Sequence, residues 1–250
     1  MNFLATAERF QFFSFSHWVV LVLVAGVFLW LHAAGKEDPD CDRACRQRKG
    51  LGLVLLVCYP LALAVRWSLN GASPYLTWAN ALPMHLCDWA AIAGGIALLT
   101  GKPLFAELTY FWALAGTLQG LLTPSLYHDF PHPIYFTFFL LHGSVVLAGL
   151  YLPLTLKWRP RPGARRRVIL WTHVYGAMAV FVNQVGGRQV NYGFLREKPA
   201  GSLLEWMGDW PWYILWMMAL VVFLAWLLFL PFDRQAKRRE DLDGSETAIS

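Results

Sequence analysis

Residues that could do chemistry gather near one end of the long apolar segments of this chain. One of these segments begins with Pro83-Met84-His85-Leu86-Cys87-Asp88. A thiol close to the beginning of a helix lies at the positive end of the helix dipole, which favours the nucleophilic thiolate. Cys87 is therefore the candidate nucleophile.

A general base for this thiol is expected from another segment. His85 and His142 are the imidazoles expected at membrane depth. Residues two positions apart in an α-helix are separated by ~200° of rotation about the helix axis, so His85 would point away from Cys87. We therefore predict a catalytic Cys87–His142 pair that forms and resolves a thioester. The alternative is that Cys87 is a small buried apolar residue and His142 an interhelical hydrogen-bonding residue.

Further polar residues lie toward the same end of the apolar segments. Because polar groups in hydrocarbon need a partner or a wet cavity, we expect a common cavity there. The residues predicted to line it or to stabilise an oxyanion are His85, Gln119, Asn183 and Gln184.

The stretch around residues 188–199 combines cations, aromatic rings, Gly and Pro. It is predicted either to bind a phosphate headgroup or to be an interfacial loop anchored by tryptophan. The predicted headgroup-binding residues are Arg188, Asn191, Tyr192, Arg196 and Lys198.

A metal site is the less favoured interpretation of the histidines. His128 and His132 flank Asp129, but Pro131 argues against the helix that a His-x3-His ligand pair needs. With His85 as a third imidazole, a site of His85, His128 and His132 stays open as the alternative. We predict no metal and no cofactor.

Composition places all of these residues in a membrane protein. Hydrophobic residues make up 57% of the 250 residues and charged residues 15%, which excludes an ordinary water-soluble surface. The formal charge of +5 comes from cations beside apolar runs, so membrane lipids are the expected partners and nucleic acid is not. The oligomeric state is not predicted.

The apolar runs predict an all-α bundle of seven transmembrane spans within residues 17–232. Residues 1–16 are predicted to form an interfacial segment and residues 233–250 a polar cytoplasmic tail. Pro83, Pro103, Pro133 and Pro211 are each expected at or near the first turn of a span. The predicted spans are 17–34, 51–70, 82–100, 103–122, 133–156, 168–187 and 211–232.

The distribution of cations gives the orientation. Alternate gaps between the spans carry sixteen Lys and Arg on one side and four on the other. By the positive-inside rule the N-terminus is outside and the C-terminus is cytoplasmic. The gap 35–50, with Cys41 and Cys45, is then a cytoplasmic loop, and the candidate cavity faces the outer leaflet.

Small residues predict close helix packing. Gly116 and Gly120 form a G-x-x-x-G pattern in the fourth predicted span, and Gly94 and Gly95 are adjacent in the third. Both pairs are expected to let a neighbouring helix approach.

Blocks along nearly the whole chain resemble a known family. They are Leu-Pro-Met-His-Leu-Cys at 82–87, Tyr-Phe-Trp-Ala-Leu-Ala-Gly at 110–116 with Gln119, Leu-Leu-Thr-Pro at 121–124, Phe-Pro-His at 130–132, His-Gly at 142–143, Asn183, Asn-Tyr at 191–192, Lys-Pro at 198–199 and Trp-Pro-Trp-Tyr at 210–213. With them the chain resembles the YwaF-like bacterial integral membrane family, which is similar at greater distance to the eukaryotic transmembrane protein 164 family.

The resemblance implies a helical lipid acyltransferase in the bacterial inner membrane. Carried over by motif order, the family's catalytic Cys and His would be Cys87 and His142. Two other classes stay open: a transporter or binding protein for a small or lipidic ligand that does no covalent chemistry, and a structural membrane subunit.

Overall fold

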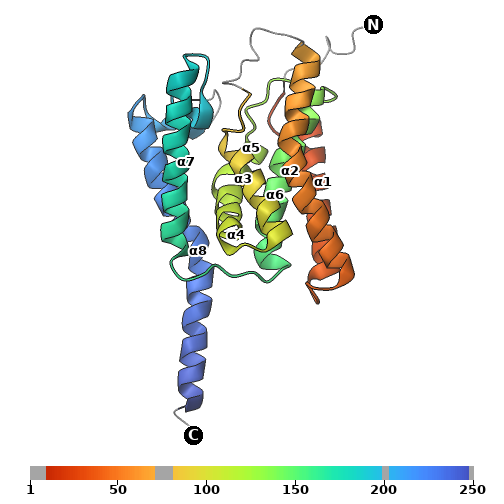
Figure 1. Ribbon diagram of the computed structural model, residues 1–250, viewed down its shortest axis with the longest axis vertical. Helices are drawn as coiled ribbons and strands as arrows, with labels where there is room; N and C mark the ends of the chain where they lie inside the picture. Colours follow the sequence, from red (N-terminus) through yellow and green to blue (C-terminus); the bar gives the residue numbers. More distant parts are fainter. Residues whose placement is uncertain (1–9, 71–80, 199–202, 248–250) are drawn as a thin grey trace.

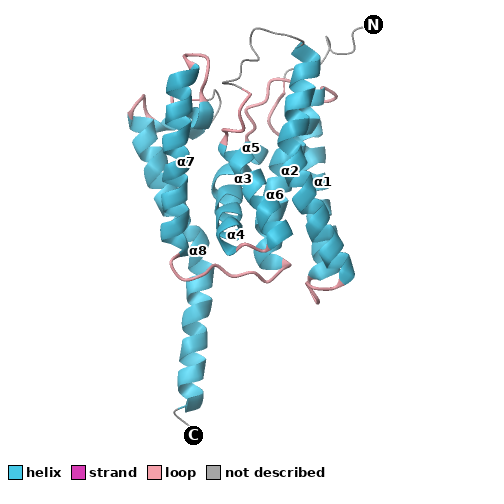
Figure 2. Cartoon of the chain, viewed as in Figure 1, coloured by secondary structure: helices cyan, strands magenta, loops and turns pink. Residues whose placement is uncertain are grey.

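The structure is a computed structural model that describes residues 10–70, 81–198 and 203–247. Over these residues it is a bundle of helices without β-strands (Figure 2), as predicted. Residues 1–9 of the predicted interfacial segment lie outside the described residues. Phe10 is buried against Phe139 and Tyr135, whereas Phe15, the first residue of the first helix, is 86% exposed.

Consecutive long helices run in alternating directions, so their ends collect at two opposite ends of the bundle (Figure 1). The elements are α1 (Phe15–Gly35), α2 (Asp42–Asn70), α3 (Leu86–Thr100), α4 (Pro103–Phe111), the π-helical segment η2 (Trp112–Thr117), α5 (Leu118–Leu122), α6 (Pro133–Leu154), α7 (Ala164–Gly186), the short 3-10 helices η3 (Tyr192–Phe194) and η4 (Leu203–Met207), and α8 (Trp212–Thr247).

Five helices of the described residues are long and apolar enough to cross a membrane: α1, α2, α6, α7 and α8. The third predicted span is the shorter apolar helix α3, of 15 residues. The fourth is divided into α4, η2 and α5. Five membrane-crossing helices are thus supported by length and composition, and the count of seven stays a prediction.

Two predicted boundaries are wrong. Cys45 lies inside α2, which begins at Asp42, because an acidic residue in the first turn favours a helix start. The third span begins at Leu86, since the Asp88 carboxylate accepts the backbone N–H of His85 at 3.0 Å and fixes the start there. Pro83 therefore precedes the helix, whereas Pro103 and Pro133 begin α4 and α6 as predicted.

The last predicted span, 211–232, agrees with the candidate span Trp212–Asp233, and α8 continues as a helix through most of the predicted polar tail, to Thr247. The tail contains Gln, Ala, Lys, Arg, Glu and Leu, which are strong helix formers, and a polar helix needs no apolar partner where it leaves the bundle.

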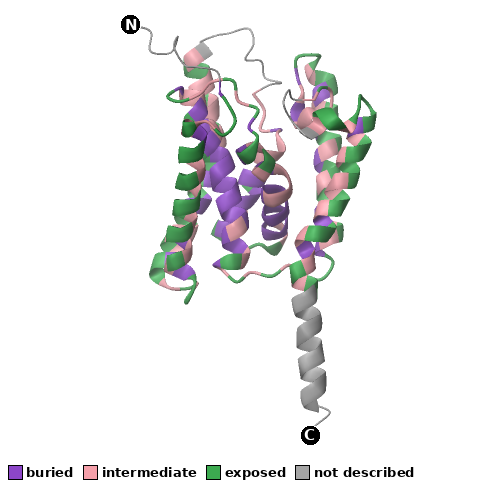
Figure 3. Ribbon diagram, turned by 180° about the vertical axis from the view of Figure 1, so that it is seen from behind, coloured by how far each residue is buried: buried purple, intermediate pink, exposed green. Residues whose placement is uncertain are grey.

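The centre of the bundle is α6 (Figure 3). In its apolar stretch 72% of the residues are buried, against 11 to 22% in the other four long helices. Those four expose apolar side chains outward, which is the arrangement that suits a lipid solvent. Residues on α6, His142 among them, are therefore held by packing on several sides.

Glycines allow the close contacts around α3, as predicted. A Cβ atom added at Gly94 would lie 2.9 Å from Leu55 of α2, and one at Gly95 would lie 2.5 Å from Leu56. One at Gly116 would lie 2.7 Å from Leu86. Each distance is shorter than normal carbon contacts, so any larger residue would require the facing leucine side chain to move.

Candidate functional site

Cys87 is the second residue of α3, at the helix end where backbone N–H groups are unpaired. His85 precedes the helix, and Asp88 is buried with its carboxylate bound to the His85 amide. The Cys87 thiol is half-buried against the main hydrophobic core. The predicted position of this thiol near a helix N-terminus is confirmed.

Contacts farther along α3 show which helices pack against its Cys87 face. Gly94 lies two turns after Cys87 on the same face, and its added Cβ would lie 2.9 Å from Leu55 of α2, 3.3 Å from Thr109 of α4 and 3.7 Å from Ala148 of α6. Since α3 and α6 begin at the same end of the bundle (Figure 1), seven residues back along both helices brings Cys87 level with Leu141 and His142. The two predicted catalytic residues thus lie on neighbouring helices, toward the same end of the bundle.

The two ring nitrogens of His142 differ in their hydrogen bonding. Its Nδ1 lies 2.8 Å from the Phe138 carbonyl oxygen, which can only accept, so Nδ1 carries the proton. Nε2 then has the lone pair that a general base requires. The ring is buried and stacks on Phe138 with centroids 4.0 Å apart. In the described part of the chain, His142 and Cys87 make no direct hydrogen bond.

The segment η2–α5 receives side chains from α3 and α6, the helices that carry Cys87 and His142. Gly116 accepts Leu86, the neighbour of Cys87, and Gly120 accepts the imidazole, since an added Cβ there would lie 2.6 Å from Cδ2 and 2.9 Å from Nε2 of His142. π-helical turns occur often at functional sites. This one lies where α3 and α6 meet the fourth predicted span.

Asn183 has a structural role in this fold. Its Oδ1 accepts the Tyr192 backbone N–H at 2.7 Å and its Nδ2 donates to the Tyr192 carbonyl at 2.9 Å. These two buried bonds hold the chain after α7 against that helix. Gln119 and Gln184, also predicted to line the cavity, are both exposed.

Most of the predicted headgroup residues also bind within their own loop. Arg196 donates to the carbonyls of Gly187 and Asn183 and so caps α7. The Asn191 side chain accepts the Arg196 amide at 3.0 Å, and Lys198 donates to the Gly208 carbonyl at 2.8 Å. Arg188 is exposed.

Tyr192 fastens this loop over the start of α3. Its hydroxyl donates to the Leu82 carbonyl at 3.0 Å and accepts the Leu82 amide at 3.1 Å. Its ring meets the edge of His85 with centroids 4.9 Å apart. Burial, reinforced by nearby Tyr59, raises the pKa of Tyr192 to about 12, so the phenol keeps the proton that it donates. The loop therefore covers the end of the bundle that holds Cys87.

The histidines of the 123–132 loop pair with each other. The rings of His128 and His132 stack with centroids 4.0 Å apart, and His132 Nδ1 accepts the Ile134 amide at the start of α6. Burial, and then the neighbouring His128, lowers the pKa of His132. Within the described ranges no three His, Cys, Asp or Glu side chains are grouped to hold a metal, so His85 does not join this pair.

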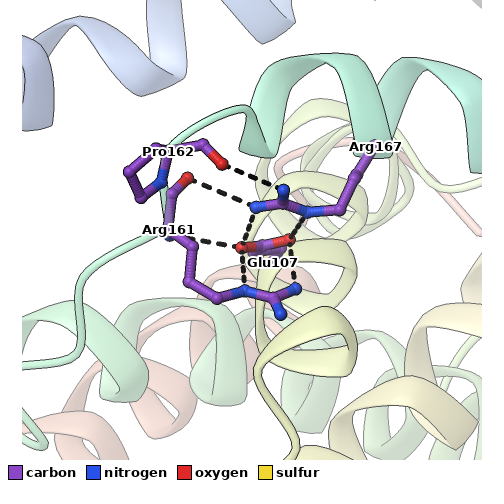
Figure 4. Close-up of polar contacts among 4 residues, drawn as sticks. All are labelled: Glu107, Arg161, Pro162 and Arg167. Carbon is purple, nitrogen blue, oxygen red and sulfur yellow. Dashed lines mark hydrogen bonds and ion pairs between the residues drawn. The ribbon is translucent and has the colours of Figure 1, made fainter.

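A buried charge network at the opposite end was not predicted (Figure 4). The fully buried Glu107 carboxylate of α4 accepts hydrogen bonds from the Arg161 and Arg167 guanidinium groups, the shortest 2.7 Å from Arg167. The Arg161 amide also donates to it at 3.2 Å. The sequence does contain a signal for this network. Glu107 is an acidic residue inside a predicted span, at the same end as the arginine-rich gap 157–167.

Comparisons with known proteins agree with the resemblance at its broader level. The family model described as TMEM164 family matches residues 12–230. An uncharacterized protein of Treponema pallidum (strain Nichols) is 28% identical over 237 residues, which cover 94% of this chain and 93% of that protein. No solved structure matches. The narrower YwaF-like assignment stays a prediction. Because the family match covers most of the chain, from the segment before α1 into α8, the protein belongs to the TMEM164 family.

Proposed function

We propose that this protein is a membrane-embedded phospholipid acyltransferase or esterase, with Cys87 as nucleophile and His142 as general base. The observation that supports it is the pairing of a thiol at the N-terminus of α3 with a buried imidazole on the neighbouring helix α6, toward the same end of the bundle. The Nε2 atom of this imidazole keeps its lone pair.

The chemistry follows from these positions. His142 Nε2 takes the proton from Cys87 Sγ, and the thiolate attacks the carbonyl carbon of an acyl ester. The imidazolium returns the proton to the departing alcohol oxygen, which leaves a thioester on Cys87. An acceptor hydroxyl, from a lysophospholipid or water, then attacks the thioester, and the proton passes through His142 back to sulfur.

The membrane arrangement that we propose has seven spans, in the bacterial inner membrane, with the N-terminus outside. The division α4–η2–α5 covers 20 residues, enough for ~30 Å at 1.5 Å per residue. The helix α3 covers ~22 Å and is completed by the segment that Tyr192 holds above it. Cys87 and His142 then open toward the outer leaflet.

For the phosphate headgroup we propose Arg188, exposed just after α7. The loop that carries Arg188 is held in place by the hydrogen bonds of Asn191, Tyr192, Arg196 and Lys198. An exposed guanidinium beside a covered site can pair with phosphate in two parallel hydrogen bonds.

The test is turnover of a phospholipid with a labelled acyl chain by purified protein in lipid nanodiscs. Cys87→Ala and His142→Ala should each lower the rate by at least ~100-fold. Cys45→Ala, a half-buried thiol at the far end of α2, should keep it. Wild-type turnover by both active-site variants would refute the proposal. Saturable lipid binding without any product in wild type would favour the binding-protein class.

A further inference from the structure

Thr117 carries a buried hydroxyl that has no partner. The residue is 3% exposed, and its Oγ1 makes no hydrogen bond in the described structure. Buried helical threonines normally donate to the carbonyl four residues back, as Thr109 does to Phe105 at 2.7 Å. At Thr117 the π turn changes this pattern, because the Ala113 carbonyl accepts the Leu118 amide. A buried polar atom without a partner is costly and needs an explanation.

The position of Thr117 in the fold brings this hydroxyl toward His142. Gly149 of α6 meets Ala113, with their Cβ positions 2.5 Å apart, and His142 meets Gly120. Thr117 lies between Ala113 and Gly120 in the chain, so it faces α6 between Gly149 and His142. Thr117 and Gly120, three residues apart, share one helix face. The Thr117 hydroxyl and His142 Nε2 are therefore expected on the same side of this segment, against α6.

The hydrogen-bonding capacities of the two atoms are complementary. His142 Nε2 can only accept, while Thr117 Oγ1 can donate. A single hydroxyl group satisfies both, by donating its proton to Nε2 and accepting from Oγ1. We propose that Thr117 and His142 together form the binding site for the hydroxyl of the acyl acceptor.

This assignment rests on the proposed function and identifies a residue for its second step. Thr117 Oγ1 donates to the acceptor oxygen and directs it toward the thioester carbonyl. That oxygen forms the new ester bond, the carbon–sulfur bond breaks, and the acceptor proton moves to Nε2 and then to Cys87 Sγ. The ligand is a hydroxyl of a lysophospholipid or of water.

A first test does not depend on activity. The ¹⁵N chemical shift of His142 Nε2 is measured in histidine-labelled protein in nanodiscs, with 1-oleoyl lysophosphatidylethanolamine or dioleoyl phosphatidylethanolamine added. A shift with the lysolipid alone, absent in Thr117→Val and kept in Thr117→Ser, supports a lipid hydroxyl. A Thr117→Val difference that neither lipid alters supports bound water. Identical shifts in wild type and Thr117→Val under all conditions overturn the site.

A second test separates the two steps of the reaction. Thr117→Val should form the labelled thioester within twofold of the wild-type rate but resolve it at least tenfold more slowly. Thr117→Ser should stay within threefold in both steps. Thr109→Val, which removes a satisfied hydroxyl from the same predicted span, should leave resolution within twofold. Wild-type resolution by Thr117→Val contradicts the assignment, whereas a wild-type protein without any thioester refutes the proposed function and leaves the chemical-shift test decisive.

Discussion

Individual buried polar residues hold this bundle together at both of its ends. At the Cys87 end the Asn183 amide replaces a backbone partner for Tyr192, using both of its polar atoms. At the other end Glu107 joins α4 to the start of α7 through Arg167. In both places, one side chain satisfies groups that would otherwise be buried without partners.

The first prediction concerns Asn183→Leu. The substitution leaves the Tyr192 N–H and carbonyl without their buried partner, which costs about 1–3 kcal/mol for each group. Its matched control is Gln184→Leu, the exposed neighbour. Thermal unfolding in detergent should show a clearly lower midpoint for Asn183→Leu and little change for Gln184→Leu. Equal midpoints for the two variants would mean that the amide clamp contributes nothing.

The second prediction concerns Glu107→Gln. The substitution leaves two guanidinium groups without their carboxylate, and because both are partly exposed to solvent a loss of about 1.5–3 kcal/mol is expected. Asp233→Asn removes the exposed carboxylate that pairs with Arg165, for which about 1 kcal/mol or less is expected. The same unfolding measurement distinguishes them. A Glu107→Gln protein as stable as Asp233→Asn would contradict the role of the network.

For individual residues, the position along the helices was easier to predict from the sequence than the hydrogen-bond partners. The placement of Cys87 near a helix N-terminus followed from residue order alone. The clamp by Asn183 did not, because its partner is the backbone of Tyr192, which carries no sequence signal. The same is true of Arg196, whose partners are the terminal carbonyls of α7.

Among the elements, η2–α5 is the one that would position the proposed reaction. It is the surface onto which α3 docks through Leu86 and α6 through His142, and both contacts depend on glycine. A helix that receives two others in this way fixes the distance between the groups they carry. Small displacements of this segment therefore alter the geometry of Cys87 relative to His142.

The third prediction follows for Gly120→Ala. The added methyl would overlap the His142 ring, so the imidazole must move. A displacement of ~1 Å can lower a catalytic rate by about 100-fold, and turnover in nanodiscs should fall by that order. Gly26→Ala on α1 meets no atom within 4 Å and should leave turnover unchanged. A Gly120→Ala protein with the Gly26→Ala rate would exclude His142 from the reaction.

The helices were predictable from apolar runs, and their irregularities were not. The sequence indicates the run 103–122 but not its π turn, which depends on how Gly116 and Gly120 dock against other helices. The helix α3 begins four residues after its predicted start. This start depends on one hydrogen bond, from the His85 amide to the Asp88 carboxylate. Tertiary contacts determine such details.

For the whole molecule, α6 is strongly buried and the other four long helices expose apolar side chains on the outside of the bundle (Figures 1 and 3). This arrangement is expected of a protein whose solvent is lipid. The alternation of cations in the sequence predicts its orientation. The end with the Glu107 network carries the arginine-rich gap 157–167, and the opposite end carries Cys87. The proposed catalytic site and this basic end therefore belong to different leaflets.

The fourth prediction tests that orientation in cells. In a protein whose four native cysteines are replaced, Ser125→Cys lies between α5 and α6 and Arg166→Cys lies in the first turn of α7. A membrane-impermeant maleimide should label position 125 in intact cells and position 166 only after permeabilisation. The reverse pattern would invert the topology and move the site to the cytoplasmic leaflet.

The most direct test of the Cys87–His142 mechanism is to measure the mass of the peptide that contains Cys87 during turnover. Purified protein is mixed with a phospholipid that carries an isotopically labelled acyl chain, quenched in acid within the first turnover and digested for mass spectrometry. The Cys87–His142 mechanism predicts the labelled acyl mass on the Cys87 peptide, released by neutral hydroxylamine and strongly reduced in His142→Ala. Acyl transfer by wild-type protein with Cys87 unmodified, and unchanged in Cys87→Ala, would contradict it.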